Sequence, residues 1–164
     1  MNDEKGQLSG EYMLLVGSLI VVLMISIFMI ANENELNIAM AAAKSGADEG
    51  VASSSSAIYP KETFNEYDDR EGLKHPYSVS IVNVSYNSSG IDENYGKQKI
   101  QFKVYAKASA DYNKKELDSI GDRINYNLRK SVAMSFNTAD STNKLYNPVF
   151  SNNYVFTTAN VVWV

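Results

Sequence analysis

The sequence predicts an α+β protein: a long N-terminal α-helix followed by a small head of antiparallel β-strands packed with one amphipathic helix. Three observations predict this fold. Residues 12–31 form an uncharged apolar run, residues 100–108 alternate apolar and polar side chains, and residues 117–132 repeat apolar side chains at spacings of three and four. We therefore expect a long helix that ends near residue 57 and a head at residues 58–164.

Composition restricts the chemistry of the chain. It has 164 residues, a formal net charge of −4 and no cysteine. The lack of cysteine excludes a disulfide framework, a thiolate metal site and a thiol nucleophile. No basic cluster is longer than Lys114-Lys115, which argues against a nucleic-acid partner.

The apolar run at residues 12–31 is the first of these three segments along the chain. As a helix, residues 12–31 would span about 30 Å, the thickness of a bilayer's hydrocarbon core. Glu11 stands directly before the run, where a carboxylate is costly to desolvate unless it is compensated. An ordinary secretory signal has a shorter apolar region with a small-x-small cleavage site close behind it. Here the nearest such site, Ala39-Met40-Ala41, lies beyond the polar residues 32–35, which argues against a secretory signal. An uncleaved single-pass membrane anchor is an alternative interpretation of the run.

The residues around Glu11 form a recognisable motif. Gln7, Ser9, Glu11 and Tyr12 match a Gln-x-Ser-x-Glu-Tyr-Leu pattern, and Met13 replaces the leucine with a side chain of similar size. Residues 5–31 resemble the class III signal peptides of archaeal type IV pilin-like proteins, in which this pattern directly precedes the hydrophobic segment.

This resemblance implies processing by a prepilin peptidase. The peptidase would cut between Gly6 and Gln7, on the cytosolic side of the membrane, so that residues 1–6 are a cleaved leader. The apolar run is kept, the mature helix covers residues 7–57, and Glu11 becomes the fifth residue. In the wider type IV pilin family a glutamate at that position is associated with subunit docking.

The resemblance also implies partners and locations. The partners are identical or related pilin subunits in a homo-oligomeric filament, the prepilin peptidase, and an assembly ATPase with its membrane platform. The precursor would lie in the membrane with a cytosolic N-terminus, and the mature chain would form a surface filament that serves adhesion. Lys5 before the run and Glu33 and Glu35 after it agree with this orientation.

Elementary electrostatics explains why cleavage would matter. Cleavage creates an α-amine at Gln7 with a reference pKa near 8, which is mostly charged at neutral pH. The carboxylate of Glu11 on one subunit can pair with that amine on its neighbour, and pairing relieves the desolvation of both charges. Alternatively, Glu11 stabilises the N-terminus of its own helix. Both can hold, but only the first gives cleavage a role.

The helix is expected to continue beyond the apolar run. No strong helix breaker follows Ala31, and several apolar or small residues share one helical face: Leu36, Ala39, Met40, Ala43, Ala47 and Val51. We expect one helix from about Leu8 to about Ala57, interrupted only mildly near Gly46 and Gly50. The alternative is two helices that are broken at Asn32 or Gly46.

The first half of the head reads as a linker and a hairpin. Residues 59–75 look like a polar linker, and a strand is expected from Tyr77 to about Tyr86. Residues 87–96 are rich in turn formers, and residues 100–108 form the clearest strand, with one polar face. The two strands should pair as an antiparallel hairpin.

The second half of the head combines a helix and short strands. Asn113, with Glu116 three positions later, predicts a capped helix that runs to about Ser135. Its apolar stripe should pack on the sheet and comprises Leu117, Ile120, Ile124, Leu128 and Val132. Residues 154–164 hold one or two strands, with 145–150 as a further candidate. The last strand is expected to be buried or to form an interface.

No constellation of catalytic or metal-ligating residues is expected. The single histidine, His75, precedes a proline in the polar linker and reads as a solvated loop residue. Asp68, Asp69 and Glu71 are a weak candidate for a cation site in what is more simply a solvated charge run. We therefore expect no enzyme activity, no cofactor and no metal.

Two N-glycosylation sequons lie within five residues of each other. They begin at Asn83 and Asn87. Asn87, in the predicted turn, is the better acceptor, whereas Asn83 qualifies only if its side chain faces outward from its strand. A surface location would make the head a glycoprotein.

The sequence thus predicts a structural subunit, major or minor, of an archaeal type IV pilus-like surface filament. The alternative is a single-pass membrane-anchored extracellular binding domain that does not polymerise.

Overall fold

The computed structural model describes residues 3–52 and 78–164, with side chains described from Gly10 onward. Four expectations lie outside these residues: the end of the first helix near Ala57, the linker with His75, the acidic candidate at residues 68–71, and the strand start at Tyr77. Contacts divide the chain into two units, Met1–Leu36 and Asn37–Val164, and each is described by itself.

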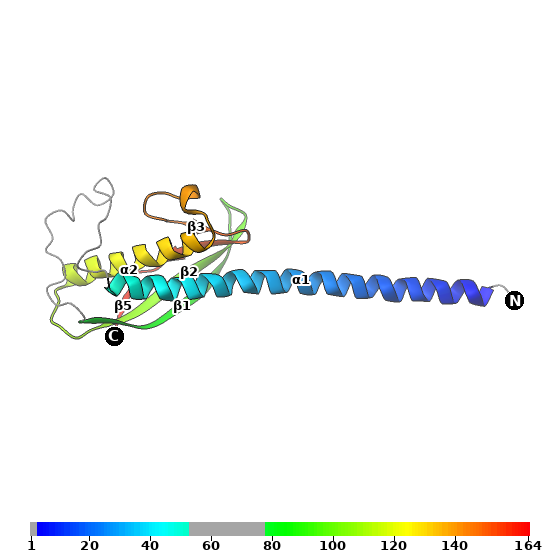
Figure 1. Ribbon diagram of the computed structural model, residues 1–164, viewed down its shortest axis with the longest axis horizontal. Coiled ribbons are helices and arrows are strands. Elements are labelled where there is room, and N and C mark those ends of the chain that lie inside the picture. Colours follow the sequence, from blue (N-terminus) through cyan, green and yellow to red (C-terminus); the bar gives the residue numbers. More distant parts are fainter. Residues whose placement is uncertain (1–2, 53–77) are drawn as a thin grey trace. The chain divides into compact units, whose positions relative to one another are not determined.

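Helix α1 (Asp3–Ala52) supplies all described residues of the first unit and the start of the second. It is one continuous helix, as Figure 1 shows, so the prediction of a single helix without a break at Asn32 or Gly46 is confirmed as far as residue 52. The helix begins at Asp3, five residues before the expected start at Leu8, so it includes residues of the predicted leader. Alanine at five of the positions 39–47 favours the helix through this region.

The second unit contains a five-stranded sheet in the order β1-β2-β4-β3, with β5 also paired to β2. Strands β1 (Val79–Asp92) and β2 (Lys97–Ala108) form the predicted antiparallel hairpin. Strand β4 (Tyr154–Thr158) runs parallel to β2, and β3 (Val149–Phe150) is antiparallel to β4. Strand β5 (Val162–Trp163) pairs with β2 in parallel further along. The α+β fold class is confirmed.

The sheet is mixed, whereas the sequence predicted antiparallel strands throughout. Helix α2 (Lys114–Ser135) connects β2 to the tail, and the chain returns to β4 in the direction of β2. A helical crossover of this kind is what allows two strands to pair in parallel. Nothing in the alternation of a short tail strand distinguishes the two pairings.

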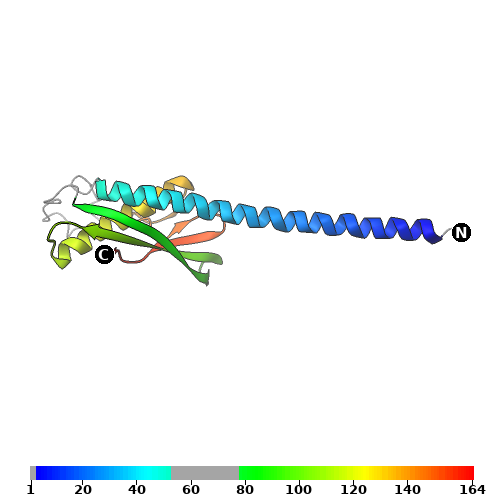
Figure 2. The same cartoon turned by 90° about the horizontal axis from the view of Figure 1, so that it is seen from below.

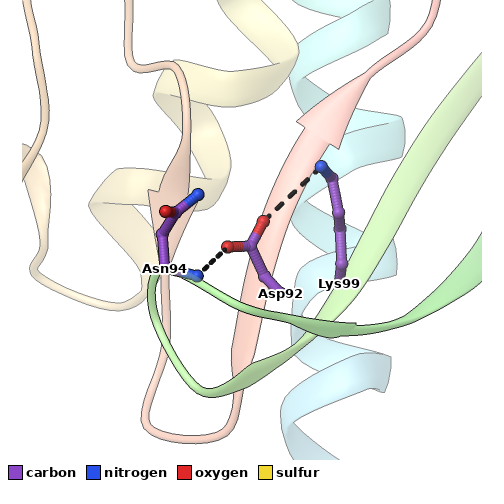
Figure 3. Close-up of polar contacts among 3 residues, drawn as sticks. All are labelled: Asp92, Asn94 and Lys99. Carbon is purple, nitrogen blue, oxygen red and sulfur yellow. Dashed lines mark hydrogen bonds and ion pairs between the residues drawn. The ribbon is translucent and has the colours of Figure 1, made fainter.

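The hairpin turn is much tighter than predicted. Residues 87–92 belong to β1 rather than to a loop, and only residues 93–96 form the turn. Gly90 takes a φ of +81° where the register shifts between Ser88 and Ile91, so the strand continues through an irregularity. The Asp92 side chain accepts a hydrogen bond from the Asn94 backbone N–H at 3.0 Å and pairs with Lys99 at 3.5 Å (Figure 3).

Helix α2 begins with the predicted capping box. The Glu116 N–H donates to Asn113 Oδ1 at 3.0 Å, and the Asn113 N–H donates to Glu116 Oε2 at 2.8 Å. Ile120, Ile124, Leu128 and Val132 of the predicted stripe are buried, while Leu117 is half-buried. In the same core the ring of Phe156 stacks on Phe102 and Phe136, with centroids 5.6 and 5.8 Å apart.

Helix α2 is also buried along a second face, which its amphipathic pattern did not predict. A Cβ added at Gly46 of α1 would lie 2.6 Å from the Asn127 carbonyl oxygen, and one added at Gly50 would lie 2.8 Å from the Ile124 Cα. The end of α1 therefore packs directly on the backbone of α2, and the two helices run side by side (Figures 1 and 2). The two glycines were expected to interrupt α1 mildly, but the helix is continuous there and they lie in close contact with the α2 backbone.

The tail between α2 and β4 is mostly irregular. Only Val149–Phe150 of the predicted strand at residues 145–150 is a strand, and a 3₁₀ helix, η2 (Ala139–Ser141), precedes it. Tyr146 has a φ of 51° and the Asn147–Pro148 peptide bond is cis. The Arg129 guanidinium fixes this tail to α2 by donating to the Leu145 carbonyl oxygen at 3.1 Å and to the Thr158 hydroxyl.

Candidate assembly segment

The assembly segment is residues 10–31 of α1, in the first unit. Its large apolar side chains are exposed with a single half-buried exception, Val16. Leu14, near the start of the segment, is 76% exposed, and Phe28, near its end, is 68% exposed. Soluble monomers rarely expose a continuous apolar surface of this size. The segment therefore requires an apolar environment from a membrane or from other chains.

Length and composition suit a membrane. Within the described residues, α1 is the one helix long and apolar enough to cross a bilayer, and no residue of its most apolar 18-residue stretch is buried. A helix that is apolar on all sides is typical of a membrane span or of the interior of an assembly.

The polar side chains inside the segment are satisfied locally. The Ser18 hydroxyl donates to the Leu15 carbonyl oxygen at 2.8 Å, and the Ser26 hydroxyl donates to the Val22 carbonyl oxygen at 2.9 Å. These bonds within the helix allow both serines to enter an apolar environment. Glu11 is then the single ionisable carboxylate of the segment, and it is exposed at the segment's N-terminal end.

The proposed processing site lies in the first turns of the same helix. The Gly6–Gln7 peptide bond falls within α1, and the side chains of Gln7 and Ser9 are outside the described residues. Positions 7 and 11 are four residues apart, so they share one helical face. After cleavage Glu11 would lie one turn from the new N-terminus, where its carboxylate stabilises its own helix or pairs with the Gln7 amine of a neighbouring subunit.

Both sequon asparagines lie on strand β1 with exposed side chains. Asn83 pairs with Tyr105 and Asn87 with Gln101, so the two asparagines share one face of the sheet. The outward orientation required of Asn83 is present. Asn87 is in a strand and not in a turn, because β1 extends to Asp92. Their glycosylation stays a prediction.

No protein-family model, curated protein or solved structure matches this chain. Function is therefore inferred from the residues themselves. In the described ranges, no group of three or more His, Cys, Asp or Glu side chains could hold a metal ion. The sequence did not predict the contact of Gly46 and Gly50 with α2. It predicted one polar face on residues 100–108, and the structure extends that face to a row of four lysines on β2. Their spacings of two and four residues were the available signal.

Proposed function

We propose that the chain is a structural subunit of an archaeal type IV pilus-like surface filament, made as a membrane precursor and cut between Gly6 and Gln7. The observation that carries this proposal is the assembly segment, an exposed apolar helix with one carboxylate at its N-terminal end. The motif of Gln7, Ser9, Glu11 and Tyr12 directly before it supports the same reading.

The physical basis is an exchange of apolar environments. In the precursor, lipid would surround the apolar side chains of the segment, and the helix is long enough to span the bilayer. In a filament, the segments of neighbouring subunits would surround one another. Both environments are apolar, so transfer from one to the other costs little hydrophobic free energy and is driven by packing and polar contacts.

The pairing of charges would make the transfer depend on cleavage. Before cleavage, the Gln7 nitrogen is an uncharged amide and six residues precede it. After cleavage, the new amine offers a cation to the Glu11 carboxylate of an adjoining subunit, and an isolated carboxylate in an apolar interior is strongly disfavoured. The processed chain, and not the precursor, would then be competent to assemble. A head that presents the β-sheet outside the shaft would serve adhesion.

The alternative function is that of a membrane-anchored extracellular binding domain, which the membrane helix taken alone supports equally well. A single-pass anchored extracellular binding domain would have the same apolar helix and would not polymerise. It gives no role to Glu11 or to the motif before it, which is why we favour the filament.

The two functions are separated by fractionation of cells that produce the chain. Surface filaments are sheared off, collected and probed with an antibody against the head. We expect the chain in the filament fraction, and immunogold labelling should decorate the fibres along their length or at defined points. Recovery solely from the membrane fraction, as dispersed monomers, would favour the anchored domain and contradict the filament.

A further inference from the structure

The sheet carries nearly all of its charge on one strand. The five strands together contain four lysines, which are all on β2, and one carboxylate, Asp92 at the end of β1. This is a net charge of +3 on a chain whose formal net charge is −4. The lysines are Lys97, Lys99, Lys103 and Lys107.

The four lysines lie on one face of the sheet. Four even-numbered residues between Lys99 and Lys107 are buried in the core: Ile100, Phe102, Val104 and Ala106. Because side chains alternate along a strand, the odd-numbered residues point to the opposite face. We call this surface the lysine face; on β2 it consists of the four lysines, Gln101 and Tyr105. Lys97 is paired with Asp92 of β1, whereas the β1 residues paired with positions 101–107 of this face are neutral: Ser80, Asn83, Ser85 and Asn87.

Two of the lysines have local partners. Lys97 Nζ donates to the Ser151 carbonyl oxygen at 2.6 Å and lies 5.9 Å from the centre of the Phe150 ring. Lys99 pairs with Asp92 at 3.5 Å, as Figure 3 shows. These contacts fix the two side chains near the hairpin turn and neutralise one charge.

The other two lysines are not neutralised within the described part of the chain. Lys103 Nζ lies 5.4 Å from the centre of the Tyr105 ring, and Lys107 is exposed. Over residues 10–52 and 78–164, no ion pair joins either of them to a carboxylate. The middle and far end of the lysine face therefore present positive charge, an aromatic ring and neutral hydrogen-bonding groups.

We propose that the lysine face binds an extended acidic polysaccharide. Lys103 and Lys107, the two lysines of this face that are not neutralised, are four residues apart, a separation of about 13 Å along a strand. A single small anion cannot bridge that distance, whereas a polymer with repeated carboxylates can. Sugar hydroxyls between the carboxylates match the neutral amide of Gln101 and the hydroxyl of Ser85, which face the same side. Electrostatic attraction of this kind also accelerates encounter with the polymer.

Two other polyanions fit the surface less well. Tight binding of nucleic acid uses a denser array of cations, with several phosphates neutralised together. Binding to an anionic lipid surface combines charge with apolar side chains that insert into the bilayer, and the exposed β1 positions on this face, Ser80, Asn83 and Asn87, are polar. The inference rests on the proposed surface location of the head, and it names the class of ligand that adhesion would use.

The experiment measures binding of the purified full-length chain in detergent to immobilised polygalacturonate, by biolayer interferometry at several salt concentrations. Because a glycan on Asn83 or Asn87 would lie on this face, both the native chain and the N83Q/N87Q chain are measured, and N83Q/N87Q is the parent for further changes. The test variant is K103Q/K107Q. The matched control is K114Q/K115Q, which removes two exposed lysines from the start of α2. Binding does not require filaments, so its failure is distinguishable from failure of assembly.

We expect the N83Q/N87Q chain to bind polygalacturonate in a salt-sensitive manner. K103Q/K107Q should weaken binding roughly tenfold, as expected for the loss of two charge contacts at the surface, while K114Q/K115Q should stay within about twofold of the parent. Circular dichroism confirms that each variant is folded. An equal loss in both lysine pairs, no binding by the parent, or tighter binding to duplex DNA or to phosphatidylglycerol vesicles than to polygalacturonate would overturn the proposal.

Discussion

The proposed assembly depends most strongly on the carboxylate of Glu11. It is exposed on a helix whose next 20 residues are uncharged, so burial of the segment in a filament would bury this carboxylate as well. A buried carboxylate needs a cation, and removing one partner of a buried pair costs about 3–5 kcal/mol. Glutamine keeps the shape of the side chain but cannot carry the charge.

We therefore expect Glu11→Gln to leave membrane insertion and leader cleavage intact and to lower incorporation into filaments more than about tenfold. The readout is the ratio of chain in sheared filaments to chain in the membrane, measured by quantitative immunoblot. Glu33→Gln is the matched control, since Glu33 is exposed on the same helix beyond the apolar run. Normal incorporation of the Glu11→Gln chain would remove the docking role.

The ionisation of Tyr126 makes the stability of the folded head depend on pH. Burial raises the pKa of Tyr126 above 10.0, and the neighbouring Tyr146, whose ring centroid is 5.6 Å away, raises it further. The folded head thus holds the proton on Tyr126 more tightly than the unfolded chain does. Its contribution to stability is fully present below pH 10 and is lost as the pH rises through the folded-state pKa.

The expected result is a steeper fall in stability above pH 10 for the native chain than for Tyr126→Phe. Urea midpoints measured by circular dichroism between pH 8 and pH 11 report this slope. Tyr86→Phe, at a tyrosine that is 45% exposed, is the control and should keep the native slope. If Tyr126→Phe also kept the native slope, the tyrosine would not be the titrating group.

At the scale of elements, the contact between α1 and α2 depends on small residues. Ala39, Ala43 and Ala47 are fully buried, and Gly46 and Gly50 bring α1 against the α2 backbone. These alanines are four residues apart and belong to the helical face that the sequence predicted. The role of the glycines could not be predicted from the sequence. A glycine in a helix normally destabilises it, and whether it lies against another backbone depends on the position of the partner helix.

The substitution Gly46→Ala tests that contact. On an open helix surface this change would stabilise the helix by about 1 kcal/mol. Here the added Cβ would meet backbone atoms of Asn127 and Leu128 at 2.6 and 2.8 Å, so we expect destabilisation of about 1–3 kcal/mol. Thermal unfolding of the full chain in detergent, followed by circular dichroism, gives the sign. Ser45→Ala, at the adjacent exposed position, should be neutral or stabilising, and a stabilised Gly46→Ala chain would contradict the close packing.

The elements were predictable where the signal was local. The capping box of Asn113 and Glu116, the alternation along β2 and the single long α1 were all read correctly from spacing and composition. The extent of β1 was not predicted correctly. Residues 87–91 have the composition of a loop, but they belong to the strand because this part of β1 pairs with β2. The parallel pairing of β4 also depends on the path of the whole chain, which local patterns do not encode.

At the scale of the whole molecule, the two units carry different kinds of information. The first unit, Met1–Leu36, is a helix with little core of its own, and its sequence already contained the segment and the motif that define the candidate site. The second unit, Asn37–Val164, has a well-formed core, and the β1 residues that neighbour the lysine face became known only with the register of β2. Assembly of the exposed apolar helix is proposed to require the amine that cleavage creates at Gln7. The N-terminal residue of chains in assembled filaments is therefore the decisive observable.

N-terminal sequencing of the chain recovered from sheared surface filaments tests that claim most directly. The account predicts a single sequence that starts at Gln7, with a free α-amine and with Glu11 as the fifth residue. A sequence that starts at Met1 in assembled filaments would contradict it, because the carboxylate of Glu11 would then be buried without the cation that cleavage was proposed to supply.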